Sequence, residues 1–325
     1  MATDLDHSKS MTWFRFVAAT ALLTSLGLSG DSQGQTPPVA AFKSSVDLVR
    51  IAAVVRDRKG RFVPDLAARD LEILDAGQQQ SITDFRHDLA GVSVALLFDI
   101  SGSMEGHLSN AREAATHLLS WLDADRDEAA VFAFDTGLDE LAPFTSGLRT
   151  LPDSMLRMTA FGETSLHDAV AQTARRAGQR EGRRRAVVVL TDGMDTASRL
   201  TPPEVSAIAA EIDVPIYVVG VVSGIDNPSA DVATASLERL AFEGPLADLA
   251  AWTGGHVFVA STPAERSAAA RQIVDELRHQ YLIAFASSGT PGWHPLVVRA
   301  RDKTLIVRAR SGYIARVLGP TAPGK

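Results

Sequence analysis

The sequence contains no cysteine among its 325 residues. Disulfide bonds, iron–sulfur clusters, thiolate zinc sites and a cysteine nucleophile are therefore excluded. Aromatic residues make up only 6% of the chain, and positive charge is in the minority, with 32 Lys and Arg against 39 Asp and Glu. The net charge of −7 argues against a nucleic-acid partner, because binding nucleic acid requires a basic face.

Long apolar runs are also missing, apart from one near the amino terminus. Residues 16–28 are uncharged and apolar, and they follow basic residues. The run is too short to span a bilayer but has the length of a signal-peptide core; the alternative is a buried amino-terminal helix. We expect residues 1–34 to be a signal peptide and linker, with translation starting at Met1 or Met11. The mature protein would then be secreted or periplasmic, without a membrane span.

The rest of the chain shows a β pattern, then an alternating pattern, then a β pattern again. Near the amino terminus, Asp75-Ala76-Gly77 predicts a hairpin turn between strands at 71–74 and 81–85. From residue 92 to 278, continuous apolar strands alternate with amphipathic helices, which predicts an α/β fold with a doubly wound parallel sheet. Three strand-like segments follow, at 281–286, 295–300 and 304–309.

These patterns divide the chain into four parts: the signal peptide and linker at 1–34, a β module at 42–89, the α/β domain at 90–278 and a β segment at 279–318. Neither β flank buries enough apolar area to be stable alone, so we expect the two flanks to pack together as one discontinuous module. From residue 279 onward the chain has seven Lys or Arg and one Asp. We interpret this excess as a solvated strand face, with docking to an acidic surface as the alternative.

Polar residues follow two of the predicted parallel strands. One strand ends in Asp99-Ile100-Ser101-Gly102-Ser103, another in Thr191-Asp192-Gly193, and a loop containing Thr164 precedes a helix between them. Ligands of open α/β sheets bind at this carboxyl edge. Two carboxylates and three hydroxyls, without His or Cys, disfavour zinc and copper and suit a hard divalent cation. Mg²⁺ is preferred because it keeps several waters and needs few carboxylates, with Ca²⁺ or Mn²⁺ as possible substitutes.

This set of residues resembles the metal-ion-dependent adhesion site of von Willebrand factor type A domains. All five signature positions are present in order: Asp99, Ser101, Ser103, Thr164 and Asp192. The resemblance implies a Rossmann-like fold in which the three hydroxyls contact the metal and the two carboxylates bind it mainly through water. It also implies a protein ligand whose Asp or Glu completes the metal shell. The flanking segments are similar to exported bacterial proteins described as von Willebrand factor A-related, common in acidobacteria.

Four residues beside this set have simpler interpretations. Ser165-x-x-Asp168 predicts a capping box for the helix that it begins. His167 lies in the first turn without a nucleophile partner, so we do not expect it to be catalytic. Glu163 is interpreted as a solvated loop residue, with tuning of the metal's charge as the alternative. Asp195 is either a turn residue or a support for the metal-binding residues.

The function we expect is an exported binding module, without enzymatic activity, that captures an acidic residue of a partner through a metal ion. The alternatives are a magnesium-dependent hydrolase and a structural envelope protein with an unused site. A phosphohydrolase would carry a second carboxylate two residues after Asp99, where this chain has Ser101. The chain has no phosphate-binding loop of the NTPase type. Its one match to a serine-nucleophile motif, at 30–34, falls within the predicted signal peptide and linker.

Overall fold

The computed structural model describes residues 48–87, 91–180, 182–211, 213–222, 240–287 and 290–315. The predicted signal peptide and linker lie outside the described residues. Within the described ranges, no helix combines the length and the hydropathy needed to cross a membrane.

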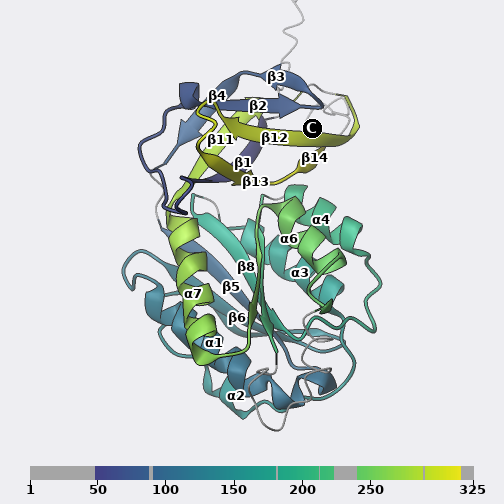
Figure 1. Ribbon diagram of the computed structural model, residues 1–325. Coiled ribbons are helices and arrows are strands. Elements are labelled where there is room, and N and C mark those ends of the chain that lie inside the picture. Colours follow the sequence, from purple (N-terminus) through teal and green to yellow (C-terminus); the bar gives the residue numbers. More distant parts are fainter. Residues whose placement is uncertain are drawn as a thin grey trace, which may run out of the picture. The chain divides into compact units, whose positions relative to one another are not determined.

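A six-stranded sheet forms the centre of the α/β domain, in the order β10-β9-β8-β5-β6-β7 (Figure 1). Every residue of β5, β6 and β9 is buried, as expected for strands covered on both faces. Neighbouring strands are parallel except that β7 runs antiparallel to β6. The doubly wound α/β prediction is therefore confirmed, with one antiparallel edge strand added. The strands are β5 (Val92–Asp99), β6 (Glu128–Phe134), β7 (Leu138–Ser146), β8 (Arg184–Thr191), β9 (Ile216–Val221) and β10 (Val257–Ala260).

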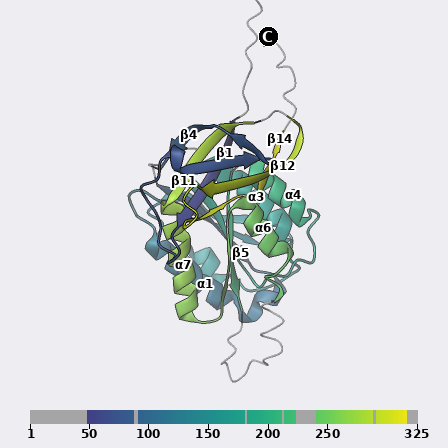
Figure 2. The ribbon, with the colours of Figure 1, turned by 45° about the horizontal axis from the view of Figure 1, so that its top comes forward.

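Helices cover both faces of this sheet. Figure 1 and Figure 2 show α1 and α7 side by side on one face, with α3, α4 and α6 on the other. Successive residues of β5 alternate between the two cores, since Leu96 packs with the first group and Leu97 with the second. The described helices are α1 (Leu108–Trp121), α3 (Leu166–Gly178), α4 (Pro202–Glu211), α6 (Pro245–Thr253) and α7 (Pro263–Arg278), together with the short α2 (Asp153–Arg157) and two 3₁₀ turns, η1 (Ala68–Asp70) and η2 (Gly102–Gly106).

The β flanks on either side of this domain form two four-stranded sheets, in the orders β13-β1-β11-β4 and β14-β12-β2-β3. Strand β1 pairs with β11 and β13, and β2 pairs with β12, so each sheet contains strands from both ends of the chain. The prediction of one discontinuous β module is confirmed. Its strands are β1 (Leu48–Arg56), β2 (Leu71–Asp75), β3 (Gln78–Gln80), β4 (Ile82–Arg86), β11 (Gln280–Ala286), β12 (Gly292–Ala300), β13 (Ile306–Ala309) and β14 (Gly312–Ala315).

The amino-terminal hairpin differs from the prediction. Ala76 and Gly77 both have positive φ, 47° and 83°, which is the geometry of a two-residue hairpin loop. Such a loop pairs the residues directly beside it, so β2 pairs with β3. The predicted second strand, at 81–85, belongs instead to β4 and pairs with β11 in the other sheet.

The basic carboxyl-terminal segment is not a free cationic face. Arg299 and Arg301 both pair with Glu72, at 2.8 and 2.7 Å. Arg308 pairs with the buried Glu276 of α7, and Arg310 is itself buried. The interpretation as a solvated strand face is therefore wrong for Arg308, which pairs with α7 of the α/β domain, and for Arg310, which is buried and bonds the carbonyl of Arg50 in β1.

The two ends of the α/β domain meet at one carboxylate. Asp127, which precedes β6, accepts a hydrogen bond of 2.9 Å from the backbone N–H of Val92. Its other oxygen accepts one of 3.1 Å from Arg278, the last residue of α7. The residue that begins β5 and the residue that ends α7 are thus held beside each other.

Candidate metal centre

The loop after β5 brings the first three predicted site residues together. Asp99 is fully buried, and its Oδ1 accepts hydrogen bonds from the Ser101 backbone N–H at 3.0 Å and the Ser101 hydroxyl at 2.6 Å. The Ser101 and Ser103 hydroxyl oxygens lie 3.1 Å apart. Because the Ser101 hydroxyl donates its proton to Asp99, its oxygen accepts from the Ser103 hydroxyl and keeps one lone pair for another ligand.

The loop after β8 joins this cluster through Thr191. The Thr191 hydroxyl donates to Asp99 Oδ2 at 2.6 Å, so both oxygens of the Asp99 carboxylate already accept protons from the chain. Asp192 is buried, with only 8% of its surface exposed, and its Oδ1 accepts from the Met194 backbone N–H at 3.1 Å. The positive φ of Gly193, 91°, lets the chain reverse direction immediately after Asp192.

The loop before α3 carries Thr164 and is bonded to both other loops. Gly102 N–H donates to Gly162 O at 3.0 Å, which ties this loop to the one after β5. The Thr164 carbonyl accepts from the backbone N–H groups of Thr196 and Ala197, each at 2.9 Å. Three loops from separate parts of the sequence therefore converge, and they carry all five predicted residues to one edge of the sheet.

The electrostatics of this edge are unfavourable without a cation. Burial raises the pKa of Asp99 to about 6, and the nearby charge of Asp192 acts in the same direction, although hydrogen bonds from Ser101 and Thr191 oppose the rise. Two carboxylates buried within reach of each other favour a positive charge between or beside them.

The donor set fits a small hard cation. Two neighbouring ligands of an octahedral Mg²⁺, each about 2.1 Å from the ion, are separated by about 3 Å, which matches the 3.1 Å between the Ser101 and Ser103 oxygens. Among the described residues, no group of three or more His, Cys, Asp and Glu side chains converges in a way that could hold a metal, and the candidate centre itself has two carboxylates. The candidate centre is rich in hydroxyls, and this composition suits Mg²⁺ better than zinc.

The predicted capping box of α3 is wrong. Its first-turn amides are capped by the loop after β8: Asp195 Oδ1 accepts from Leu166 N–H at 2.9 Å, and the Ser198 hydroxyl accepts from His167 N–H at 2.9 Å. Ser165, the N-cap residue, makes no such side-chain bond. Asp168 instead accepts from the backbone N–H groups of Arg199 and Leu200, so it fastens the loop that carries Asp192.

The three other residues considered beside the site are His167, Asp195 and Glu163. The His167 ring nitrogen Nδ1 lies 2.6 Å from Asp195 Oδ2, and His167 is buried. Asp195 thus joins the loop after β8 to the first turn of α3. A support of the metal-binding residues by Asp195 stays a prediction. Glu163 is exposed.

Sequence reasoning missed two contributors. Thr191 bonds Asp99 directly, but an uncharged residue beside Asp192 gives no local sign of that contact. Asp135 follows β6 at the same carboxyl edge, and its carbonyl accepts from Ser165 N–H at 2.7 Å. The rule that polar residues at strand ends gather at one edge would have found both.

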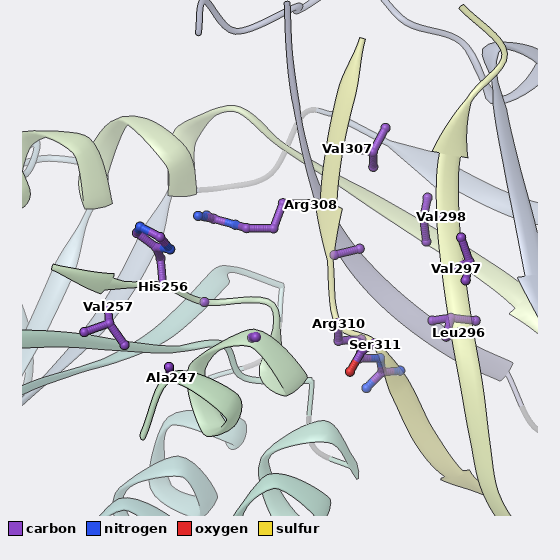
Figure 3. Close-up of a pocket in the computed structure, with 13 residues that line it drawn as sticks. Ala247, His256, Val257, Leu296, Val297, Val298, Val307, Arg308, Arg310 and Ser311 are labelled. Carbon is purple, nitrogen blue, oxygen red and sulfur yellow. The ribbon is translucent and has the colours of Figure 1, made fainter. Parts of the chain in front are cut away.

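A cavity lies away from the candidate metal centre. It has a volume of about 520 Å³ and is lined by α6, by residues around the start of β10, and by β12 and β13. Figure 3 shows Arg308 extending from β13 toward His256 across this space. Since β10 is parallel to β9 and begins at Val257, the cavity lies at the amino edge of the sheet, opposite the candidate metal centre.

A family model of the von Willebrand factor type A domain matches residues 94–194, a range that contains all five predicted site residues. No curated protein matches the chain. Solved structures are similar at low identity. The conserved hypothetical protein BatB from Bacteroides thetaiotaomicron is 19% identical over 57% of this chain and 98% of its own, with a TM-score of 0.44. A von Willebrand factor type A protein from Catenulispora acidiphila is 14% identical over 84% and 74%, also at 0.44. The PilB minor pilin from Streptococcus sanguinis is 14% identical over 61% and 63%, again at 0.44.

Proposed function

Because the chain contains a von Willebrand factor type A domain, we propose that it is an exported protein-binding module whose ligand attaches through a divalent metal ion. The ligand presents an Asp or Glu side chain, and the module carries out no chemical reaction on it. The observation that carries this proposal is the 3.1 Å spacing of the Ser101 and Ser103 hydroxyls above the buried Asp99.

Each residue of the centre has a distinct part in this proposal. Ser101, Ser103 and Thr164 would hold Mg²⁺ through their hydroxyl oxygens. Asp99 orients the Ser101 hydroxyl, and both its oxygens are occupied by donors of the chain, which favours an indirect role. When bound, the ion supplies an electrophilic position that attracts a carboxylate.

The balance of charge explains why a partner's carboxylate would bind there. Neutral hydroxyl ligands do not cancel the positive charge of the ion that they contact. Asp99 and Asp192 would interact with the ion through water, and so would cancel less of its charge than direct ligands. An incoming Asp or Glu then forms a direct ionic bond in a partly buried setting, where Coulomb attraction is stronger than in water. Direct coordination by both carboxylates of the chain would quench this attraction.

The metal part of the proposal is tested by titrating Mg²⁺ alone into the purified protein in a calorimeter. We expect one site in the wild type, loss of binding in Asp192→Ala and in Ser101→Ala, and unchanged binding in Asp153→Ala. Asp153 is the matched control because its side chain, in α2, is 82% exposed. Equal Mg²⁺ binding by wild type and Asp192→Ala would contradict the proposal.

The binding and export parts need the producing cell. Capture from its envelope fraction should retain a ligand in Mg²⁺ but not in chelator, and not on Asp192→Ala. Mass spectrometry should place the mature amino terminus between residues 30 and 37, outside the cytoplasm. Cytoplasmic protein with residues 16–28 intact would contradict export.

A further inference from the structure

Two large apolar side chains are exposed beside the candidate metal centre. Phe161 is 78% exposed, more than any other large hydrophobic residue that the structure describes as exposed. Met194 is 49% exposed. Phe161 lies three residues before Thr164 and Met194 two residues after Asp192, so two of the three loops of the centre each present one apolar group to solvent.

The backbone that carries Phe161 is fixed. Its N–H donates to Ile100 O at 2.8 Å, and the next residue, Gly162, accepts from Gly102 N–H at 3.0 Å. These bonds join the Phe161 segment directly to the loop that contains Ser101 and Ser103. Exposure of an aromatic ring to water is unfavourable in the free protein. Because its backbone is already held in place, the ring loses little conformational entropy when a partner covers it, and this is a property of interface anchors.

Met194 is placed in a comparable way on the other loop. Its N–H donates to Asp192 Oδ1, and the preceding Gly193 packs against Ala241 and Phe242, where an added Cβ would lie 3.1 Å from each. The flexible thioether side chain of Met adapts to partners of different shape. The rim of the centre therefore combines a rigid apolar group with an adaptable one.

The charges at the same rim limit the partner further. Glu105 and Glu163 are exposed on the loops of the centre. These carboxylates repel further acidic groups, and so a run of acidic residues would lose at the rim what its first carboxylate gains at the metal.

We propose that the partner presents a single Asp or Glu next to large apolar residues, which pack on Phe161 and Met194, rather than an acidic cluster. This inference rests on the proposed function, because the metal ion binds the partner's carboxylate. Phe161 and Met194 then determine which partner residues are favoured next to that carboxylate. Removing a Phe-sized apolar contact lowers affinity about tenfold or more.

The test uses a random heptapeptide library displayed on phage and selected on the Mg²⁺-loaded protein. We expect enriched peptides to contain one acidic residue with a large apolar residue within two positions. Selection on the double variant Phe161→Ser, Met194→Ser should keep the acidic residue and lose the apolar preference. Ile306→Ser is the matched control, because Ile306 is 61% exposed on β13 in the β module, and it should keep both.

A synthetic peptide from the wild-type selection provides the second measurement. Its affinity, by fluorescence anisotropy, should fall about tenfold or more on the double variant and remain unchanged on Ile306→Ser. Enrichment of acidic runs, or of acidic peptides without apolar neighbours, would overturn this inference alone. Selection that is unaffected by chelator and by Asp192→Ala would overturn the proposed function instead.

Discussion

At the scale of single residues, Asp168 accepts hydrogen bonds from backbone groups that lie 31 and 32 residues later in the sequence. Its carboxylate holds the N–H groups of Arg199 and Leu200, so it ties α3 to the loop after β8. Asp168→Ala should lower the free energy of unfolding by about 1–3 kcal/mol, since two backbone donors lose a charged acceptor. It should also weaken Mg²⁺ binding, because the same loop carries Asp192.

Urea unfolding and Mg²⁺ calorimetry measure these two effects, with Asp168→Asn as the intermediate variant that keeps one acceptor. Unchanged Mg²⁺ affinity in Asp168→Ala would show that the loop holds its shape without this carboxylate.

His294 gives the β module a dependence on pH. Burial acts to lower the pKa of His294, but hydrogen bonds to Thr290 O and to the Asp75 carboxylate together outweigh it and raise the pKa above its ordinary value. A raised pKa in the folded state stabilises the protein at low pH, and that stabilisation is lost as the pH rises through the folded value.

The free energy of unfolding of wild type minus that of His294→Gln should therefore be largest below about pH 6.5 and should decline at higher pH. Urea titrations at a series of pH values measure the difference. A difference that grows with pH would mean that the ring is held neutral in the fold.

The five candidate metal-site residues could be selected from the sequence because their types and their positions, after apolar strands or, for Thr164, before a helix, are local features. The residues that hold the loops of the site in place could not be predicted in this way. Asp168 and Ser165 match a capping box by spacing, yet the cap comes from Asp195 and Ser198, which lie some thirty residues later. Local spacing cannot show that an acceptor from a distant part of the chain has replaced a local one.

At the scale of elements, the turn between α6 and β10 depends on close approach of two backbones. A Cβ at Gly255 would lie 1.9 Å from the carbonyl oxygen of Ile216, at the start of β9. Backbone cannot move aside as a flexible side chain can, so Gly255→Ala should cost about 3 kcal/mol or more.

Gly137→Ala is the control, because nothing lies within 4 Å of a Cβ there, and its effect should stay within about 1 kcal/mol. The midpoints of thermal unfolding of the two variants are compared with that of the wild type. Similar midpoints for Gly255→Ala and Gly137→Ala would contradict the close approach of the two backbones.

Sequence patterns predicted the elements unevenly. Fully buried strands such as β5 are continuous apolar runs and could be recognised directly. Strand β7 could not, because it is an exposed edge strand that contains charged residues and Pro143. The pairing of β4 with β11 could not be predicted either, because the residue pattern of a short polar strand does not show which sheet the strand joins.

At the scale of the whole molecule, the buried Tyr281 of β11 joins the two ends of the chain. Its hydroxyl accepts from Leu66 N–H at 3.1 Å and donates to Val63 O at 2.7 Å. Tyr281→Phe removes both bonds while keeping the packing, and it should cost about 1–2 kcal/mol.

Hydrogen exchange should accelerate at the Leu66 amide, while the amides of β5 keep their protection. Unchanged exchange at Leu66 would mean that another group satisfies that amide once the hydroxyl is gone.

The meeting of Val92 and Arg278 at Asp127 also bears on the order in which the chain folds. Thr83 and Ala284 bond to each other across 201 residues, and closing so long a loop in an unfolded chain carries a large entropic cost. If the α/β domain folds first, its two ends already lie beside each other, and the strands that flank it meet across a short gap. In pulse-labelling during refolding, protection should therefore appear in β5 before β1, so that the β module closes last although its first strand is the first to leave the ribosome.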